Sequence, residues 1–263
     1  MLAEAAEKVL KRDRIIVIAG LAAVTALAWV YVFQIASSVT GMDVNSAQMS
    51  MPRSQAWQSA DIALTFMMWA VMMVAMMTPS ATPMILMFAR VNRQRQANHE
   101  SAPPTIVFLL GYLLVWISFS AAATFVQWGL HSAALLSPEM ISVTPLVGGV
   151  LLLLAGIYQF TPLKRICLTR CRTPLSFLMT EWREGTRGAL IMGVRHGITC
   201  VGCCWLLMAL LFVGGVMNLL WVALLAGSVL LEKVVQAGQW VSRAIGVLTI
   251  GWGAWLLIQV WRM

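Results

Sequence analysis

The feature that most restricts the fold of this chain is a series of long apolar runs separated by short segments rich in Lys and Arg. A transmembrane helix needs about 20 mostly apolar residues to cross the hydrocarbon of a bilayer. Hydrophobic residues make up 60% of the chain and charged residues 11%, against about 45–50% and about 25% in soluble domains. A soluble domain of this composition would have too little polar surface. We therefore predict an all-α, polytopic transmembrane helical bundle, with residues 1–263 as a single membrane-embedded domain.

The apolar runs predict about seven spans, with six as the alternative. In chain order these spans cover residues 15–36, 60–77 with a continuation to 89, 105–127, 144–160, 198–214, 217–231 and 241–260. The run from Ile198 to Leu231 is too long for one crossing, so we divide it at Gly214–Gly215. Its first half is short, and an earlier start near Ala189 is an alternative. The first run lacks a small-residue cleavage site, so we expect a retained span rather than a cleaved signal.

Lys and Arg gather in alternate connecting segments: before the first span, at 90–95, at 164–187 and at 233–243. Cytoplasmic loops of membrane proteins collect these residues. The alternation therefore predicts seven crossings of a bacterial inner membrane with the amino terminus in the cytoplasm. The net charge of +8 is explained by this topology. A nucleic-acid-binding face would need a soluble basic patch, so we exclude nucleic acid as a partner.

Methionine is concentrated in the second expected span, FMMWAVMMVAMMTPS. Five of these methionines fall in two neighbouring helical stripes: Met68, Met72 and Met76 in one, Met73 and Met77 in the other. The thioether is a soft, neutral ligand that suits Cu(I) better than Zn²⁺ or Mg²⁺, although Met is also a common filler of irregular cores. Pro79 and Pro83 follow the stripes, and we expect them to break or kink the helix.

The fifth expected span carries a histidine and three cysteines in RHGITCVGCCW. Helical spacing places His196, Cys200 and Cys203 within an arc of about 60° on one face, with Cys204 beside it. Thiolate and imidazole form a capable ligand set for soft and borderline metals. A lone cysteine would be an ordinary buried hydrophobe, but this grouping predicts a metal or redox site.

A second cysteine pair, Cys167 and Cys171, lies in the basic segment TPLKRICLTRCRTP and shares one face if that segment is helical. The charge pattern places the pair in the cytoplasm, where thiols stay reduced. We expect it to exchange metal with a carrier; a surface pair without a role is the alternative. Glu232, beside Lys233 at the end of the sixth span, is a further candidate ligand. A solvated anchoring pair at the membrane interface explains these two residues equally well.

These strings resemble the prokaryotic family of predicted metal-binding integral membrane proteins, a domain-of-unknown-function family in which some members are labelled copper chaperones. The matching strings are MMWAVMMVAMMTPSATPM, YQFTPLKRICLTRCRTPL, MGVRHGITCVGCCWLLMALLFVGGVMNLLW and VLLEK. The resemblance implies a metal-handling membrane protein. The positions that match the family motif are Met72, Met76, Met77, Pro79, Cys167, Cys171, His196, Cys200, Cys203, Cys204, Asn218, Glu232 and Lys233.

The leading hypothesis is a membrane protein that binds and transfers a soft metal ion, with Cu(I) first and zinc as the alternative. It would act as a transporter or membrane copper chaperone, and we expect no enzymatic activity. The methionine stripes would guide the ion, and the cysteines of the fifth span with His196 would hold it. Expected partners are the lipid bilayer and a cytoplasmic or periplasmic copper carrier or a membrane metalloenzyme complex. Self-association stays open.

Two other function classes stay open. A membrane thiol–disulfide oxidoreductase would use Cys200 and Cys203 and exchange electrons with the second cysteine pair or a quinone. No thioredoxin-like pattern accompanies the pair, and the methionine stripes would be unexplained. A structural subunit would use Gly246, Gly251 and Gly253 to pack against partner helices, which leaves the clustered sulfur unexplained.

Overall fold

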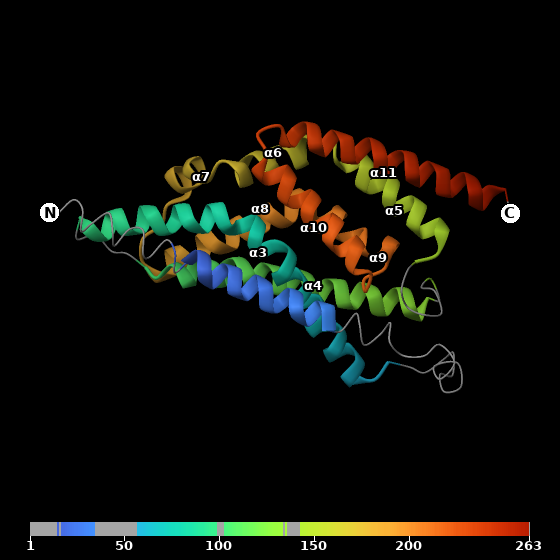
Figure 1. Ribbon diagram of the computed structural model, residues 1–263, viewed down its shortest axis with the longest axis horizontal. Helices are drawn as coiled ribbons and strands as arrows, with labels where there is room; N and C mark the ends of the chain where they lie inside the picture. Colours follow the sequence, from blue (N-terminus) through green and yellow to red (C-terminus); the bar gives the residue numbers. More distant parts are fainter. Residues whose placement is uncertain are drawn as a thin grey trace.

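The computed structural model describes residues 15, 17–34, 57–98, 103–133, 135 and 143–262. Within these ranges every element is an α-helix, as predicted. In chain order the helices are Val17–Gln34, α3 (Ser59–Ala97), α4 (Thr105–Ser132), α5 (Pro145–Tyr158), α6 (Pro162–Arg172), α7 (Pro174–Glu181), α8 (Gly185–Ala209), α9 (Leu211–Gly214), α10 (Leu219–Val234) and α11 (Gly238–Trp261). They form one elongated bundle (Figure 1). The amino-terminal basic segment lies outside the described residues.

Each expected span coincides with a helix, but the helices differ in length. Five are long and apolar enough to cross a membrane: Val17–Gln34, Ser59–Ala97, Thr105–Ser132, Gly185–Gly214 and Gly238–Trp261. The pair α5 and α6, bent by 66°, would give a sixth. Helix α10 has 16 residues, or about 24 Å of length, which is shorter than the roughly 30 Å of hydrocarbon. Seven crossings and the side of the amino terminus therefore stay predictions.

A repeated Thr-Pro pair sets the start of three helices. The pairs are Thr144–Pro145 at α5, Thr161–Pro162 at α6 and Thr173–Pro174 at α7. Proline is favoured at the first helical position because its fixed φ suits the helix and its missing N–H needs no partner there. At α6 the Thr161 hydroxyl oxygen also accepts from the backbone N–H of Lys164 at 3.3 Å. These starts produce the sharp turn between α5 and the basic helix α6.

Helix α3 continues through Pro79 and Pro83, so of the two expected outcomes, a break or a kink, the break does not occur. Its two halves run in different directions in Figure 1, which is the milder consequence of an internal proline. The Thr78 hydroxyl donates to the carbonyl of Val74 at 2.7 Å, one of several hydroxyl contacts in this proline region. With 39 residues, α3 is about 58 Å long. It is therefore longer than the bilayer hydrocarbon is thick.

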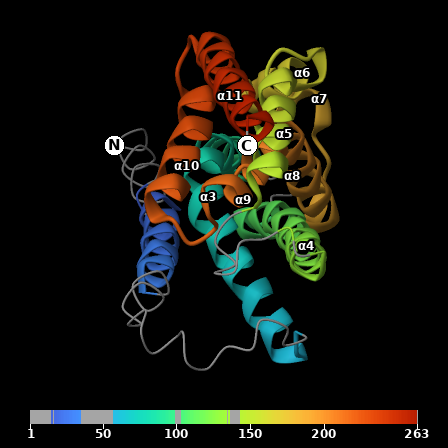
Figure 2. The same ribbon diagram turned by 90° about the vertical axis from the view of Figure 1, so that its right-hand side faces the viewer.

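Helices α4 and α8 pack backbone to backbone. A Cβ atom at Gly111 would lie 2.3 Å from the carbonyl oxygen of Leu190, and one at Gly193 would lie 2.1 Å from that of Phe108. Glycine allows this approach because it has no side chain, the usual role of small residues between membrane helices. The contact holds α8, which carries the three clustered cysteines, close against α4. Viewed along the bundle in Figure 2, α3 runs between α4 and α10, and it contacts both.

Helices α5 and α11 form a second glycine-based pair. A Cβ at Gly246 would lie 3.1 Å from the Gly156 carbonyl oxygen, and one at Gly253 would lie 2.9 Å from that of Gly149. Two of the three glycines that suggested a structural subunit are thus used inside this chain. Only Gly251 of those three faces open space.

The long run from Ile198 to Leu231 divides where it was predicted to divide. Helix α8 begins at Gly185, earlier than Ile198 and even than Ala189, and the short α9 ends at Gly214. Gly215 follows with φ +92°, a conformation that favours glycine. The Asn218 side chain then caps α10 by accepting from the backbone N–H of Trp221 at 3.2 Å. This polar residue inside an apolar run is therefore a helix cap.

Candidate metal site

The three cysteines of α8 face the interior of the bundle, and each is at most 1% exposed. The thiols of Cys203 and Cys204 donate to the carbonyl oxygen of Cys200 at 3.1 and 3.0 Å. Because Cys203 and Cys204 follow Cys200 by three and four positions, their side chains lie next to it on the same helical face. All described cysteines are free thiols.

Helix α6 brings a fourth thiol to this cluster. The sulfur of Cys171 is a close neighbour of the sulfurs of Cys200 and Cys203. Cys167, one turn earlier, packs on Gly202, where an added Cβ would lie 3.0 Å from its Sγ. Among the described residues Cys167 makes no hydrogen bond to another thiol. The structure thus brings one member of the second cysteine pair into the α8 cluster and leaves the other beside it.

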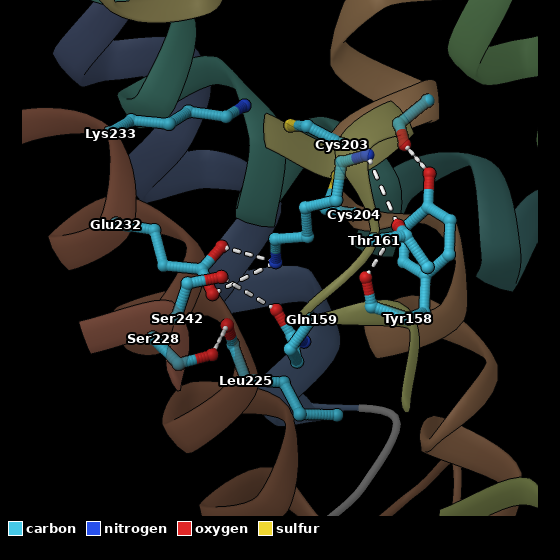
Figure 3. A network of polar contacts seen from close by, with 12 residues as sticks. Tyr158, Gln159, Thr161, Cys203, Cys204, Leu225, Ser228, Glu232, Lys233 and Ser242 are labelled. Atoms are coloured by element: carbon cyan, nitrogen blue, oxygen red, sulfur yellow. Dashed lines mark hydrogen bonds and ion pairs between the residues drawn. The ribbon is translucent and has the colours of Figure 1, made fainter. Parts of the chain in front are cut away.

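The sulfur of Cys200 has two further polar neighbours. The Lys233 ammonium donates to it at 2.9 Å and to the Ser80 hydroxyl at 3.0 Å. The Tyr112 hydroxyl lies 3.3 Å from the same sulfur. Figure 3 shows the Lys233 side chain extending from its helix towards the side of α8 that carries Cys203. Cys200 is therefore the point where α3, α4, α8 and α10 meet.

The methionine stripes end at this point. Met72, Met73, Met76 and Met77 are buried, whereas Met68 is half-buried. The Tyr112 hydroxyl that lies near Cys200 also donates to the Met77 carbonyl at 3.1 Å. The stripes therefore face the bundle interior rather than lipid, and their inner end lies one tyrosine away from the thiols.

His196 lies one turn before Cys200 and is 3% exposed. Its ring packs against those of Phe108, Tyr112 and Phe177, with centroids 5.5 to 6.1 Å apart. Its Nδ1 has no hydrogen-bond partner within the described part of the chain. A buried nitrogen without a hydrogen-bond partner is costly. The Nδ1 atom is therefore available to bind a ligand, which the surrounding aromatic rings would enclose.

Glu232 occupies a separate polar cluster. Its carboxylate accepts two hydrogen bonds from the Lys164 ammonium, at 2.9 and 2.8 Å, and both residues are 1% exposed. Beside this ion pair the Ser242 hydroxyl donates to the Gln159 side chain at 2.8 Å. The interpretation of Glu232 and Lys233 as a solvated anchoring pair is wrong, because these neighbours are directed to two interior sites, as Figure 3 shows.

The thiols do not form a finished coordination shell. Across the described ranges, no group of three or more His, Cys, Asp and Glu side chains has the arrangement of a metal site. The physical reason is local, since Cys203 and Cys204 are directed to the Cys200 carbonyl, and Lys233 and Tyr112 both lie at the Cys200 sulfur. Rotation about their Cα–Cβ bonds would free these sulfurs. Several clustered thiols with nearby thioethers form the donor set that soft metals prefer.

Three functional contacts were not predicted from the sequence. Tyr112 was not singled out, although it is the only tyrosine in the apolar third span and a polar side chain there is a recognisable signal. The Lys164 partner of Glu232 lies 68 positions away in the chain, and one sequence carries no information about such a pairing. The sulfur contact of Lys233 depends in the same way on how α8 and α10 pack.

Comparison with known protein families matches residues 66–256 to the family described as PpoB2, copper chaperone. The matched segment covers most of the chain and contains every candidate ligand named above. No curated protein and no solved structure showed a significant match to the chain.

Proposed function

The chain belongs to the PpoB2 copper chaperone family, and on this premise we propose that it binds Cu(I) inside the membrane and passes it to a partner. The ligands would be thiols from Cys171, Cys200, Cys203 and Cys204. The observation that carries the proposal is that two helices bring these four thiols together, one from α6 and three from α8.

Copper fits this donor set better than zinc does. Thioether ligands favour Cu(I), and thiolates bind both Cu(I) and zinc, but a structural zinc site is a closed tetrahedron of four ligands in fixed positions. Here the thiols are adjacent but directed to backbone and lysine partners. Such a cluster can offer two or three sulfurs to an ion and release it again, which is what a carrier needs.

The Lys233 ammonium matches the charge of a copper–thiolate complex. Two thiolates and one Cu(I) carry a net charge of −1, and an uncompensated charge in a low-dielectric interior is costly. With its nitrogen 2.9 Å from the Cys200 sulfur, Lys233 would balance that charge. We assign Lys233 the role of counter-charge rather than ligand, because an ammonium has no free lone pair.

The buried methionines would supply the ion to the thiols. They form neutral, weaker sites along α3 that end at the Tyr112 contact beside Cys200. An ion that moves from thioether to thiolate moves to a stronger ligand, so transfer in this sense needs no energy source. The charge pattern predicts that this direction is inward, and α6, with its basic surface, would be the exit to a cytoplasmic acceptor.

His196 is the candidate for an additional ligand. Its unpartnered Nδ1 lies on α8 one turn before Cys200. A neutral imidazole would complete a mixed sulfur and nitrogen shell without adding charge.

The direct test is a Cu(I) titration of the detergent-purified, reduced protein against a chromogenic competitor. Wild type is expected to bind about one Cu(I) per chain, and the variant with Ser at Cys200, Cys203 and Cys204 is expected to lose that site. Cys171→Ser should weaken binding, whereas Cys167→Ser, one turn away on α6, is the matched control and should not. Wild-type affinity in the triple variant would overturn the proposal.

The same sample separates copper binding from thiol–disulfide exchange. An oxidoreductase would form a mixed disulfide with a substrate, trapped at Cys200 or Cys203 when the other cysteine is replaced by Ser. Such a trapped species in a protein that binds no copper would favour the enzymatic function.

A further inference from the structure

A cavity of about 350 Å³ lies where the bend between α5 and α6 meets the first turns of α11. Its polar lining includes Gln159, Lys164, Arg165, Ser242 and Arg243. This cavity is separate from the thiol cluster and has no role in the proposed copper chemistry.

The positive charge of the cavity comes from two arginines. Lys164 is neutralised by its buried ion pair with Glu232, but Arg165 and Arg243 are exposed and have no carboxylate partner among the described residues. The Arg243 guanidinium lies 4.9 Å from the ring centroid of Trp240. Stacking on an aromatic ring holds a guanidinium in place and leaves its N–H edge available for an anion.

A buried amide adds an unused donor. Gln159 is 6% exposed, and its Nε2 has no hydrogen-bond partner in the described part of the chain. Its Oε1 accepts from Ser242 at 2.8 Å, a contact visible in Figure 3. This contact assigns the oxygen end of the amide to Ser242 and leaves the NH₂ end of this cavity-lining residue without an acceptor. A buried donor without a partner is uncommon in folded proteins.

The cavity is open to the outside of the bundle, and exposed apolar side chains lie at or next to its lining residues. Phe160, Leu163 and Trp240 near it are 43%, 57% and 68% exposed. In a membrane-spanning bundle, exposed side chains of this kind contact lipid, and Trp is enriched at the headgroup level. The two arginines belong to the basic segments that the charge pattern predicts on the cytoplasmic side. A ligand with a phosphate at the cavity and acyl chains along the exposed apolar side chains would satisfy both surfaces.

We propose that this cavity binds the phosphate group of an anionic phospholipid, with the guanidinium groups of Arg165 and Arg243 as its main donors and the Gln159 amide as a third. Arginine recognises phosphate through paired, charge-assisted hydrogen bonds, and basic pockets between membrane helices are a recognised site for acidic headgroups. Bound lipid would also connect α6 to α11 and so support the bend that places Cys171 beside the α8 thiols.

The test uses the full-length protein in a neutral detergent, with lipid adducts counted by native mass spectrometry. Phosphatidylglycerol, phosphatidylcholine and inorganic phosphate are added in separate titrations. Arg165→Gln with Arg243→Gln removes the proposed donors, and Arg170→Gln with Arg187→Gln removes the same charge from exposed positions outside the cavity. Arg165→Lys with Arg243→Lys keeps the charge but loses the paired hydrogen bonds. Melting temperatures verify that each variant is folded.

Wild type is expected to bind phosphatidylglycerol more tightly than phosphatidylcholine. The cavity Gln variant should bind it roughly tenfold more weakly, since two charge-assisted contacts are lost; the Lys variant should be intermediate and the outer variant unchanged. Inorganic phosphate that competes with lipid and needs the same arginines would support the phosphate site. Its ligand would then be free phosphate from solution rather than a lipid. Equal lipid binding by wild type and the folded cavity Gln variant would overturn the proposal, whatever the copper titration shows.

Discussion

The ammonium nitrogen of Lys233 lies 2.9 Å from the sulfur of Cys200, in the bundle interior between α8 and α10. This contact makes a lysine at the end of an apolar helix part of the sulfur cluster. Replacing Lys233 with Gln should weaken Cu(I) affinity by about 1.4 kcal/mol or more, which is tenfold, because the negative copper–thiolate complex loses its counter-charge.

The control for this prediction is Lys233→Arg, which keeps the positive charge and should retain most of the affinity. Both variants are measured by competition titration of reduced protein. Unchanged affinity in the Gln variant would mean that Lys233 serves packing only.

The Lys164–Glu232 ion pair predicts how a single and a double substitution change the stability of the protein. Glu232→Gln leaves the buried Lys164 charge without its partner and should destabilise the protein by about 3–5 kcal/mol. Adding Lys164→Met should recover much of that loss, because the charge is removed with its partner. The free energy of unfolding in mixed detergent micelles measures both.

The same double variant decides whether Glu232 is a copper ligand. If the carboxylate serves only Lys164, the folded double variant binds Cu(I) like wild type. A loss of copper affinity in that variant would instead assign Glu232 to the metal.

The α4–α8 contact predicts a sharp dependence on glycine. Gly193→Ala forces a Cβ to within 2.1 Å of a backbone oxygen, and we expect a loss of about 1–3 kcal/mol from overpacking. Gly129→Ala on α4, where nothing lies within 4 Å of the added Cβ, should cause no loss. Thermal unfolding of the two variants, monitored by size-exclusion chromatography, compares their stabilities. Equal stability would contradict the close packing of α4 against α8.

The methionine stripes predict a kinetic effect. Met72→Leu with Met76→Leu conserves volume and should cost less than about 1.5 kcal/mol per site, but it removes two thioethers from the interior. We expect slower loading of Cu(I) at unchanged final stoichiometry, measured by stopped-flow spectroscopy. Met67→Leu with Met179→Leu, at exposed positions, is the matched control. If the variant with Met72→Leu and Met76→Leu loads Cu(I) at the wild-type rate, the methionine stripes serve only core packing.

The helices were predictable from the sequence because apolar runs mark them, although α3 is longer and α10 shorter than one crossing of the bilayer. The division at Gly214–Gly215 was also readable, since only glycine favours the φ of +92° found at Gly215. Pro79 and Pro83 were expected to break or kink the helix, and of these two outcomes α3 shows the kink. The start of α8 was less accessible, because its first turns carry Arg187 and lie outside the apolar run.

The site was predictable in part. Helical spacing alone places Cys200, Cys203 and Cys204 side by side. The approach of Cys171 to them depends on the 66° bend between α5 and α6, and the Lys233 contact depends on how α10 packs against α8. Such long-range contacts arise from tertiary packing, which one sequence does not display.

The measurement that tests the central claim most directly is X-ray absorption spectroscopy of the Cu(I)-loaded, reduced protein, with Cys171→Ser beside Cys167→Ser. If thiols from α6 and α8 share the ion, wild type shows a copper shell dominated by sulfur. In that case the sulfur count falls in the Cys171 variant and is unchanged in the Cys167 variant. A shell without sulfur, or one identical in all three proteins, would contradict the assignment of copper to this cluster.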